Sequence, residues 1–213
     1  MTSSDATPEL DLSLRIESPR LVIGYLDPNS DAQCDFVVEV VNTPEFIAGN
    51  GGGTPTPDRA TARELLSKDI PYLAQTGFGR YIVALKPEPK DDIQPGDEQS
   101  PVVYIGWVTM KMRHHPNSPT IPDIGFQIAR QFWRRGYASE AAGALLKYFE
   151  EKRGIHEFAG YCNEDNEASQ KTLQRVGFEN HGMRTIAFSP TEPTLSVLVW
   201  TKGLRSAPEN YRL

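Results

Sequence analysis

Residues 122–152, PDIGFQIARQFWRRGYASEAAGALLKYFEEK, change their hydrophobic periodicity once, after Arg130. Before that point apolar residues alternate with polar residues or glycine, which predicts a strand over residues 123–129. From Ala138 onward the apolar residues recur three and four positions apart, which predicts a helix with one buried face. The turn WRRGYA, residues 133–138, joins the two and leads directly into the helix. The stretch therefore predicts a strand, a basic turn and a helix.

The start of this helix has the properties of an anion-binding site. Backbone N–H groups in the first turn of a helix have no partner within the helix, and the helix dipole places a partial positive charge there. Gly136 allows the backbone to approach a ligand closely, and Arg130, Arg134 and Arg135 add positive charge. We expect a phosphate or, more specifically, a diphosphate to bind here. The sequence patterns of a Walker loop and of a dinucleotide-binding turn are both absent.

The run FWRRGYASEA, residues 132–141, resembles motif A of the GNAT acetyltransferases, in particular the branch of Rim-type N-terminal acetyltransferases of ribosomal proteins. Trp133 stands where the wider family has Gln or Arg, as is usual for that branch. The resemblance implies that backbone N–H groups of the turn hold the diphosphate of coenzyme A. The contacts it implies are Arg134, Arg135, Gly136, Tyr137, Ala138 and Ser139.

A second motif follows the helix. Residues 155–162, IHEFAGYC, have the pattern of a strand, and the run from residue 163 to residue 178 resembles motif B of the same branch. The resemblance implies that Asn166 hydrogen-bonds the arm of coenzyme A. It also implies that Ser169 protonates the leaving thiolate, because Leu173 occupies the position where many GNATs have a tyrosine. The residues alone leave a second role open for Ser169, which is to satisfy a backbone amide at the helix start.

The resemblance also implies how the arm of coenzyme A is held. In the GNAT fold two neighbouring parallel strands splay apart, and open backbone groups on one strand bond to the arm like an added strand. In this sequence that strand contains Gln127, Ile128 and Ala129. An amide at or near Ile128 is expected to polarise the thioester carbonyl as an oxyanion hole.

The base that deprotonates the acceptor amine is less clearly marked. Asp123 is one candidate, and His114 and His115, which are neighbours in the sequence, are others because histidine titrates near neutral pH. A chain of water molecules is an alternative. No third His, Cys or spaced carboxylate supports a metal site at the two histidines. We therefore expect no metal, and we interpret the histidines as a solvated loop pair. Cys162 is expected to be a buried apolar residue rather than a nucleophile.

The remaining sequence predicts the other elements of one domain. Apolar patterns predict strands at residues 20–26, 81–85, 102–112, 182–188 and 195–202, and helices at residues 31–41, 58–74 and 167–176. The opening run SPRLVIGYL resembles the first strand of the same branch. The glycine-rich segment 49–57 is expected to cover the acceptor site as a mobile lid, and the proline-rich segment 86–101 to be a disordered surface excursion.

These elements together imply an α+β protein with the GNAT fold. We expect a twisted mixed sheet of six or seven strands, with four main helices on its two faces and a splayed central pair of strands. A single domain is expected over residues 18–205, with a loose N-terminal segment over residues 1–17 and a tail over residues 206–213.

The composition restricts the class of protein. Apolar residues make up 38% and charged residues 23% of the 213 positions, as is typical of a soluble globular protein. The sequence has no apolar run long enough for a membrane span, no secretory signal and only two cysteines, so we expect a cytoplasmic protein. A net charge of -6 makes a nucleic-acid partner unexpected. The sequence leaves both a monomer and a homodimer open.

The expected function is acetyl-CoA-dependent transfer of an acetyl group to a primary amine. The amine belongs to a small molecule or to a protein N-terminus, and the sequence does not distinguish the two. Two alternatives stay open. One is a non-catalytic acyl-CoA-binding or regulatory module on the same fold, and the other is a phosphate-binding domain for a nucleotide.

Overall fold

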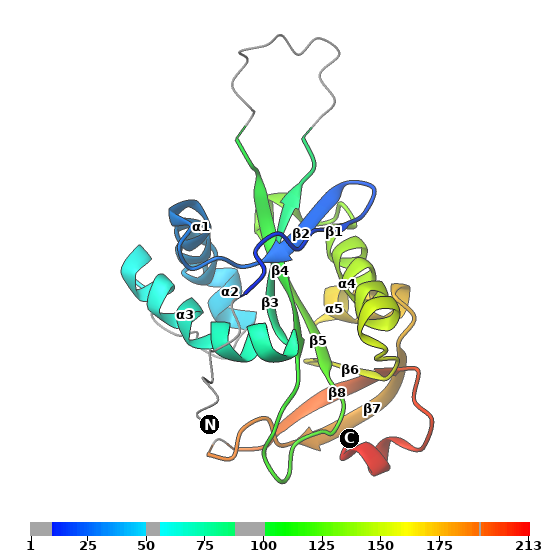
Figure 1. Cartoon of the computed structure of the whole chain (residues 1–213). Coiled ribbons are helices and arrows are strands. Elements are labelled where there is room, and N and C mark those ends of the chain that lie inside the picture. The colour runs from blue at the N-terminus through cyan, green and yellow to red at the C-terminus, as the bar shows by residue number, and fades with distance from the viewer. Residues whose placement is uncertain (1–9, 50–55, 88–100, 192) are drawn as a thin grey trace, which may run out of the picture.

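A computed structural model describes all residues of the chain except 1–9, 50–55, 88–100 and 192 (Figure 1). Its described strands form one sheet in the order β1-β2-β3-β4-β5-β6-β8-β7. The strands are β1 (Ile16–Glu17), β2 (Leu21–Tyr25), β3 (Gly79–Leu85), β4 (Tyr104–Lys111), β5 (Asp123–Ile128), β6 (Phe158–Cys162), β7 (Glu179–Ile186) and β8 (Leu195–Lys202). Most of the expected lid and of the expected excursion lies outside the described residues.

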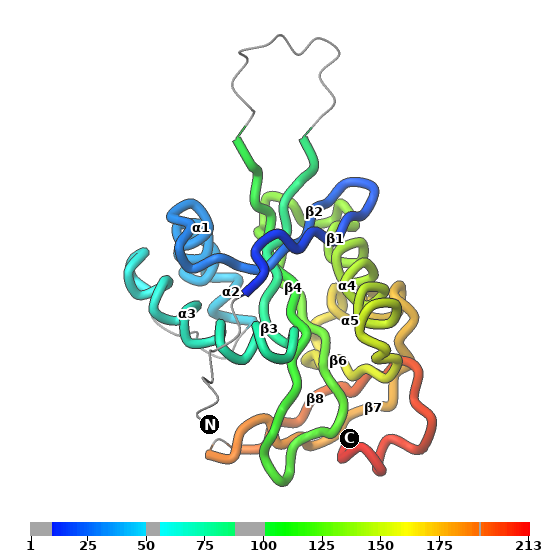
Figure 2. The backbone as a smooth tube through the Cα atoms, viewed as in Figure 1, coloured from blue at the N-terminus to red at the C-terminus, as the bar shows by residue number. Residues whose placement is uncertain are grey.

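Helices cover both faces of the sheet (Figures 1 and 2). The α-helices are α1 (Asp31–Val41), α2 (Pro44–Gly49), α3 (Arg59–Thr76), α4 (Tyr137–Arg153) and α5 (Glu167–Arg175), and the 3-10 helices are η1 (Arg130–Phe132) and η2 (Pro208–Tyr211). The helices α1, α2 and α3 lie on one face, and α4 and α5 lie on the other. Burial of apolar side chains between each helical layer and the sheet is the main favourable contribution to folding. None of the described helices is both long and apolar enough to span a membrane.

The α+β fold with a mixed sheet and helices on both faces is confirmed, but the expected number of strands is wrong. The described sheet has eight strands, because Ile16–Glu17 forms β1 and pairs antiparallel with β2. Ile16 is 8% exposed and packs in the main core, so the N-terminal segment is not loose as far as residue 17. A strand of two residues is too short to show a hydrophobic period, which is why the sequence did not reveal it.

The C-terminal residues pack against the domain. The Thr120 amide donates a hydrogen bond to the Tyr211 carbonyl over 3.1 Å, and Leu213 is buried in a small apolar cluster beside β6, β7 and β8. The segment expected to be a tail therefore supports the loop between β4 and β5.

The central parallel strands β5 and β6 splay apart, as the sequence predicts. They pair only at Asp123 with Ala159 and at Ile124 with Gly160, and each strand then continues without pairing to the other. Gly160 is required at this point, because a Cβ there would lie 2.7 Å from a methyl carbon of Leu173. The close packing of α5 on β6 thus depends on this glycine, and the splayed strands form a wedge that opens toward the start of α4.

Candidate active site

The turn before α4 forms a concave arrangement of backbone amides. Arg134 has a φ of 62° and Gly136 has a φ of 79°, so two residues in the left-handed region flank Arg135. Such alternation directs successive N–H groups toward one point and makes an anion-binding nest. The backbone geometry of this turn is therefore that of an anion-binding nest, at the place where the glycine and the arginines predict a phosphate site.

The start of α4 lacks the side-chain cap found on three other helices. Ser30, Asp58 and Asn166 each accept a hydrogen bond from the first turn of α1, α3 and α5 respectively. Gly136 stands at the same position of α4 and offers no side chain. Within the described part of the chain, the amides of residues 134–139 donate to no protein acceptor. These amides are available to a ligand, and the helix dipole favours an anion.

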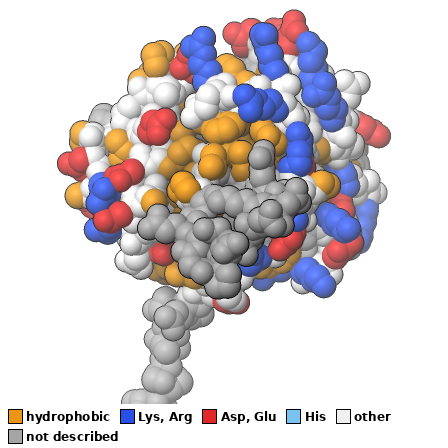
Figure 3. Space-filling model, turned by 90° about the horizontal axis from the view of Figure 1, so that it is seen from above, with side chains coloured by type: hydrophobic (Ala, Val, Ile, Leu, Met, Phe, Trp, Pro, Cys, Tyr) orange, Lys and Arg blue, Asp and Glu red, His pale blue; other side chains and the backbone are white. Residues whose placement is uncertain are grey.

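The arginines near this turn differ in their surroundings. Arg134 and Arg135 are exposed beside the nest, whereas Arg130 forms an ion pair with Glu45 of α2. Seen from above, the molecule shows a hydrophobic patch bordered by Lys and Arg side chains (Figure 3). A further arginine, Arg20, immediately precedes β2, contacts the start of α4 and was not predicted as a site residue. It lies in the SPRLVIGYL run, whose likeness to the branch's first strand was the available signal.

Two backbone amides of β5 face the wedge. The Ala129 amide donates to the Ile105 carbonyl of β4 over 2.8 Å, and the Ala159 amide donates to the Pro122 carbonyl over 2.8 Å. Because neighbouring residues of a strand direct their backbone groups to opposite sides, the amides of Phe126 and Ile128 face β6. The strands have separated there, so these amides lie in the wedge.

Only one of the three strand residues predicted to bind the arm of coenzyme A has its amide in the wedge. Ile128 does, whereas Gln127 and Ala129 direct their backbone groups toward β4. The indole N–H of Trp133 donates to the Ile128 carbonyl over 2.5 Å, so the Ile128 amide is the more accessible group. The side chain of Gln127 lines a small pocket with Glu39 and Glu45 on the α1–α2 side.

Ser169 and Asn166 lie together at the start of α5. Asn166 Oδ1 accepts a hydrogen bond from the Ser169 amide over 3.0 Å, so Asn166 caps the helix. The Ser169 hydroxyl is therefore not needed for capping, and it has no hydrogen-bond partner among the described residues. Leu173 is 1% exposed and packs in the core, where it offers no polar group. The hydroxyl of Ser169 is thus free to act on a ligand.

Asp123 forms a buried ion pair at the closed end of the wedge. It is 7% exposed, and its two carboxylate oxygens accept from Arg113 Nε over 3.0 Å and from Nη2 over 3.4 Å. Burial raises the pKa of the Asp123 carboxyl, and the charge of Arg113 opposes that shift. Arg113 also donates to the Phe188 carbonyl over 3.1 Å and lies over the Phe188 ring. Asp123 therefore has Arg113 as a fixed partner, and Arg113 in turn contacts the loop between β7 and β8.

Of the two adjacent histidines, His114 is exposed, as the sequence suggests, whereas His115 is partly buried. His114 Nε2 lies 2.5 Å from the Tyr72 hydroxyl of α3. His115 Nε2 is buried and has no hydrogen-bond partner. The His114 ring also meets the Tyr72 ring edge-on, so the loop between β4 and β5 contacts α3. No group of three or more His, Cys, Asp or Glu residues in the described chain is arranged to hold a metal ion.

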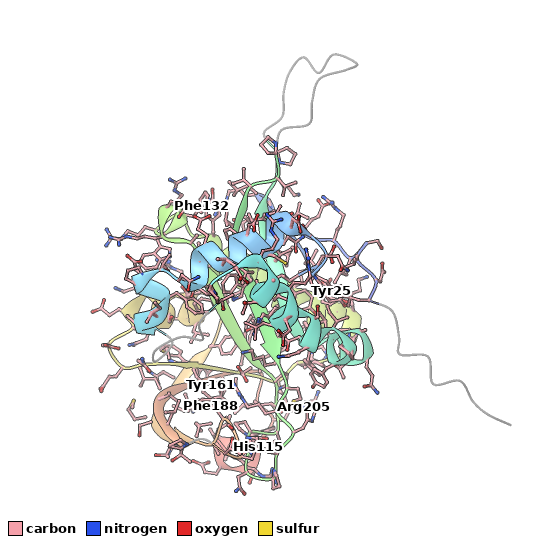
Figure 4. The ribbon with its side chains drawn as sticks, turned by 90° about the vertical axis from the view of Figure 1, so that its left-hand side faces the viewer. Tyr25, His115, Phe132, Tyr161, Phe188 and Arg205 are labelled. Atoms are coloured by element: carbon pink, nitrogen blue, oxygen red, sulfur yellow. The ribbon has the colours of Figure 1, made fainter. Side chains whose placement is uncertain are left out.

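Tyr161 is a residue of interest that the sequence did not reveal. It lies on β6 at the first position beyond the pairing with β5, and its buried hydroxyl has no partner. Its ring meets the Phe188 ring edge-on at 4.9 Å (Figure 4). Burial raises the pKa of the Tyr161 hydroxyl, and the nearby charge of Asp123 adds to the shift. Its only sequence signal was an aromatic residue near the end of a predicted strand.

Comparison with known proteins identifies the family of this chain. The model of the acetyltransferase (GNAT) domain matches residues 20–179. The uncharacterized N-acetyltransferase YoaA of Bacillus subtilis (strain 168) is 28% identical over 91 residues, which are 43% of this chain and 49% of that protein. The match thus covers about half of that relative's length.

Two solved structures illustrate the likeness of the fold. RimL, the ribosomal L7/L12 alpha-N-protein acetyltransferase in complex with coenzyme A, has a TM-score of 0.61 at 15% identity, over 90% of this chain and 98% of that one. The microcin C7 self immunity acetyltransferase MccE, in complex with acetyl-CoA and AMP, has a TM-score of 0.62 at 15% identity, over 88% and 94%. With a family model that matches most of its length, the chain belongs to the GNAT acetyltransferase family.

Proposed function

We propose that this protein transfers an acetyl group from acetyl-CoA to a primary amine. The observation that carries the proposal is an uncapped helix start beside an open wedge between two parallel strands. A long ligand with a diphosphate at one end and a thioester at the other matches both features. Acetyl-CoA is such a molecule, and RimL and MccE were solved with coenzyme A and acetyl-CoA respectively.

The diphosphate binds to the amides of residues 134–139. These amides have no protein acceptor, and they converge because Arg134 and Gly136 lie in the left-handed region. Arg134 and Arg135 are exposed beside them and add charge-assisted contacts to the phosphate oxygens.

The arm of coenzyme A continues from this site into the wedge, along β5. The Ile128 amide donates to the arm, and Asn166, whose Oδ1 caps α5, offers its side-chain N–H groups. Phe126 lies two residues deeper in the wedge than Ile128, and two residues from Ile124, the last residue of β5 that pairs with β6. Its amide is the donor that we assign to the thioester oxygen, where negative charge develops during the reaction.

The reaction is a direct transfer with no acyl-enzyme. The neutral amine attacks the thioester carbonyl carbon, so that a C–N bond forms and the C–S bond breaks. The Ser169 hydroxyl donates its proton to the leaving thiolate and takes a proton from solvent. The proton of the amine passes to a base. Asp123 and His114 already have partners in Arg113 and Tyr72, so we assign this role to water in the cleft.

The acceptor is a small-molecule amine or a protein N-terminus. RimL is named for acetylation of a ribosomal protein, and MccE for self immunity to microcin C7, so proteins of this fold differ in acceptor. The acceptor reaches the thioester from the α1–α3 side, because α4 and α5 cover the opposite face. Glu39 and Glu45 lie on that side; Arg130 is paired with Glu45, so Glu39 is the carboxylate that favours a cationic amine.

A non-catalytic acyl-CoA-binding module is the second candidate. It is favoured by Leu173, which fills with an apolar group the position where many GNATs have a tyrosine. It is also favoured by Asp123, whose carboxylate is held by Arg113 and is not open to a substrate.

The test measures thiol release from acetyl-CoA in the presence of polyamines, amino acids, aminoglycosides and peptides with a free N-terminus. We expect release with at least one amine, and a thermal unfolding midpoint raised by coenzyme A but not by ATP. Stabilisation by coenzyme A with no release on any amine supports the binding module. Equal stabilisation by ATP, or none by coenzyme A, rejects both.

A further inference from the structure

Arg20 immediately precedes β2, and its side chain contacts residues 135–140, which form the turn before α4 and the first turn of the helix. Its Nη1 donates to the Arg135 carbonyl over 3.0 Å, and its Nε donates to Glu140 Oε2 over 2.7 Å. Its guanidinium carbon lies 4.5 Å from the centre of the Tyr137 ring. The hairpin of β1 and β2 is next to the start of α4 (Figure 1), and Arg20 connects the two. One side chain thus binds a carbonyl, a carboxylate and an aromatic face of the turn that carries the free amides.

The contact with the Arg135 carbonyl sets the direction of an amide in the nest. The C=O of Arg135 and the N–H of Gly136 belong to one trans peptide and point in opposite directions. When Arg20 holds the carbonyl on one side, the Gly136 amide is held toward the other. Arg134 has a φ of 62°, a conformation that costs a non-glycine residue about 1–2 kcal/mol. A fixed carbonyl next to it helps to keep that conformation.

The contact with Glu140 affects the charge near the nest. This carboxylate is one turn into α4, and its side chain is only 14% exposed. Burial acts to raise the pKa of Glu140, but hydrogen bonds from Ser18 and Arg20 outweigh it and hold the pKa below its ordinary value. Glu140 is therefore ionised at neutral pH. An unpaired carboxylate so close would repel an anion, and the charge of Arg20 neutralises it.

We propose that Arg20 is a positioning residue for the diphosphate of the acyl donor. It holds the peptide between Arg135 and Gly136 in the orientation that the nest needs, and it neutralises Glu140. This inference rests on the proposed function, because it requires that the nest binds a diphosphate. Arg20 acts through the turn, so its removal weakens the binding of the donor without changing the chemical step.

The test compares two donors that differ in the diphosphate. Acetyl-CoA carries it, and acetyl-pantetheine lacks it but has the same thioester and arm. For Arg20→Met we expect the KM for acetyl-CoA and the Kd for coenzyme A to rise about tenfold, with kcat within twofold of the wild type. With acetyl-pantetheine, kcat/KM is expected to stay within twofold. Equal losses with both donors would mean a general structural role and would overturn the proposal.

Three further variants sharpen the result. Arg20→Lys keeps the charge but cannot contact the carbonyl and the carboxylate with one planar fork, so we expect a rise of about threefold. Combining Arg20→Met with Glu140→Gln removes the unpaired carboxylate, and we expect it to restore part of the affinity. Arg205→Met makes the same change in net charge at the end of the molecule away from Phe132 (Figure 4) and is expected to have no effect.

These experiments distinguish a failure of the proposed function from a failure of the role of Arg20. A wild-type protein with no affinity for coenzyme A contradicts the proposed function and, with it, the role of Arg20. Normal affinity in the wild type and unchanged affinity in both Arg20→Met and Arg20→Lys contradicts only the role of Arg20. Circular dichroism of each variant checks that the chain is folded in every comparison.

Discussion

Two regions of the wedge are built in different ways. The donor side consists mainly of backbone amides from one continuous run, residues 126–139, around two residues with positive φ. The closed end of the wedge consists instead of side chains from separate segments, namely Arg113, Asp123, Tyr161 and Phe188. A site made of local backbone depends on a few conformations of one turn. A site made of distant side chains depends on the packing of the whole domain.

This difference predicts that mutations at the closed end affect stability first. Replacing Arg113 by Met leaves the buried Asp123 carboxylate without its partner, and we expect the free energy of unfolding to fall by about 3–5 kcal/mol. Urea unfolding measures the change. The control is Arg59→Met, which removes exposed ion pairs to Asp31 and Asp35 and is expected to cost less than about 1 kcal/mol. Equal losses in the two variants would mean that the buried pair has no special role.

Mutations on the donor side should affect binding instead. Gly136 and Gly154 flank α4 at φ values of 79° and 66°; a Cβ at Gly154 would meet nothing within 4 Å, and a Cβ at Gly136 would lie 3.5 Å from Arg20 Nη2, an ordinary van der Waals distance. Valine at either site is strained to a similar degree. We expect Gly136→Val to raise the Kd for coenzyme A more than 100-fold, and Gly154→Val to leave it within about threefold, as measured by calorimetry. Equal effects on binding would reject the phosphate site at the nest.

Ser169 tests the chemical step. Loss of a general acid typically lowers the rate by at least about 100-fold, so Ser169→Ala is expected to reduce kcat by about that factor. The Kd of this variant for coenzyme A should change little, because Asn166 caps α5 and the Ser169 hydroxyl is not needed for the cap. Ser169→Thr keeps a hydroxyl and should retain most of the rate. A normal kcat in Ser169→Ala would assign protonation of the thiolate to another group.

The smallest effect on stability is expected for Glu140, and it depends on pH. Its pKa in the folded protein is held below the ordinary value, so its contribution to stability is complete above the pKa of the unfolded chain, about 4.3. That contribution is lost as the pH falls below this value and through the lowered pKa. The difference in unfolding free energy between the wild type and Glu140→Gln should thus be about 1 kcal/mol at pH 7 and shrink below pH 4. A difference that is constant with pH would show that ionised Glu140 does not stabilise the turn.

The sequence predicted the elements with clear periods. The strand ending at Ile128, the helix after Gly136 and the separation of the two parallel strands all follow the expected pattern. The extra strand at Ile16–Glu17 was missed, because two residues show no period. The surroundings of His114 and Asp123 were also missed. Their partners, Tyr72 and Arg113, are found only when the loop between β4 and β5 is placed in the fold.

The backbone direction of β5 is a feature that the residue types alone did not predict. Gln127, Ile128 and Ala129 were all expected to face the arm, but alternate residues of a strand direct their amides to opposite sides. Which of them face the wedge depends on the register with β4, and that register is a property of the sheet. It places Phe126 and Ile128 in the wedge.

The sequence by itself determined the uncapped start of α4, since a glycine with positive φ at the helix start is a property of one short segment. The tertiary structure alone decided that Arg20, more than 100 residues away in the sequence, holds this segment, and that Asp123 is engaged by Arg113. Local backbone conformation follows from the neighbouring residues, whereas a contact between distant side chains exists only after the sheet has brought them together.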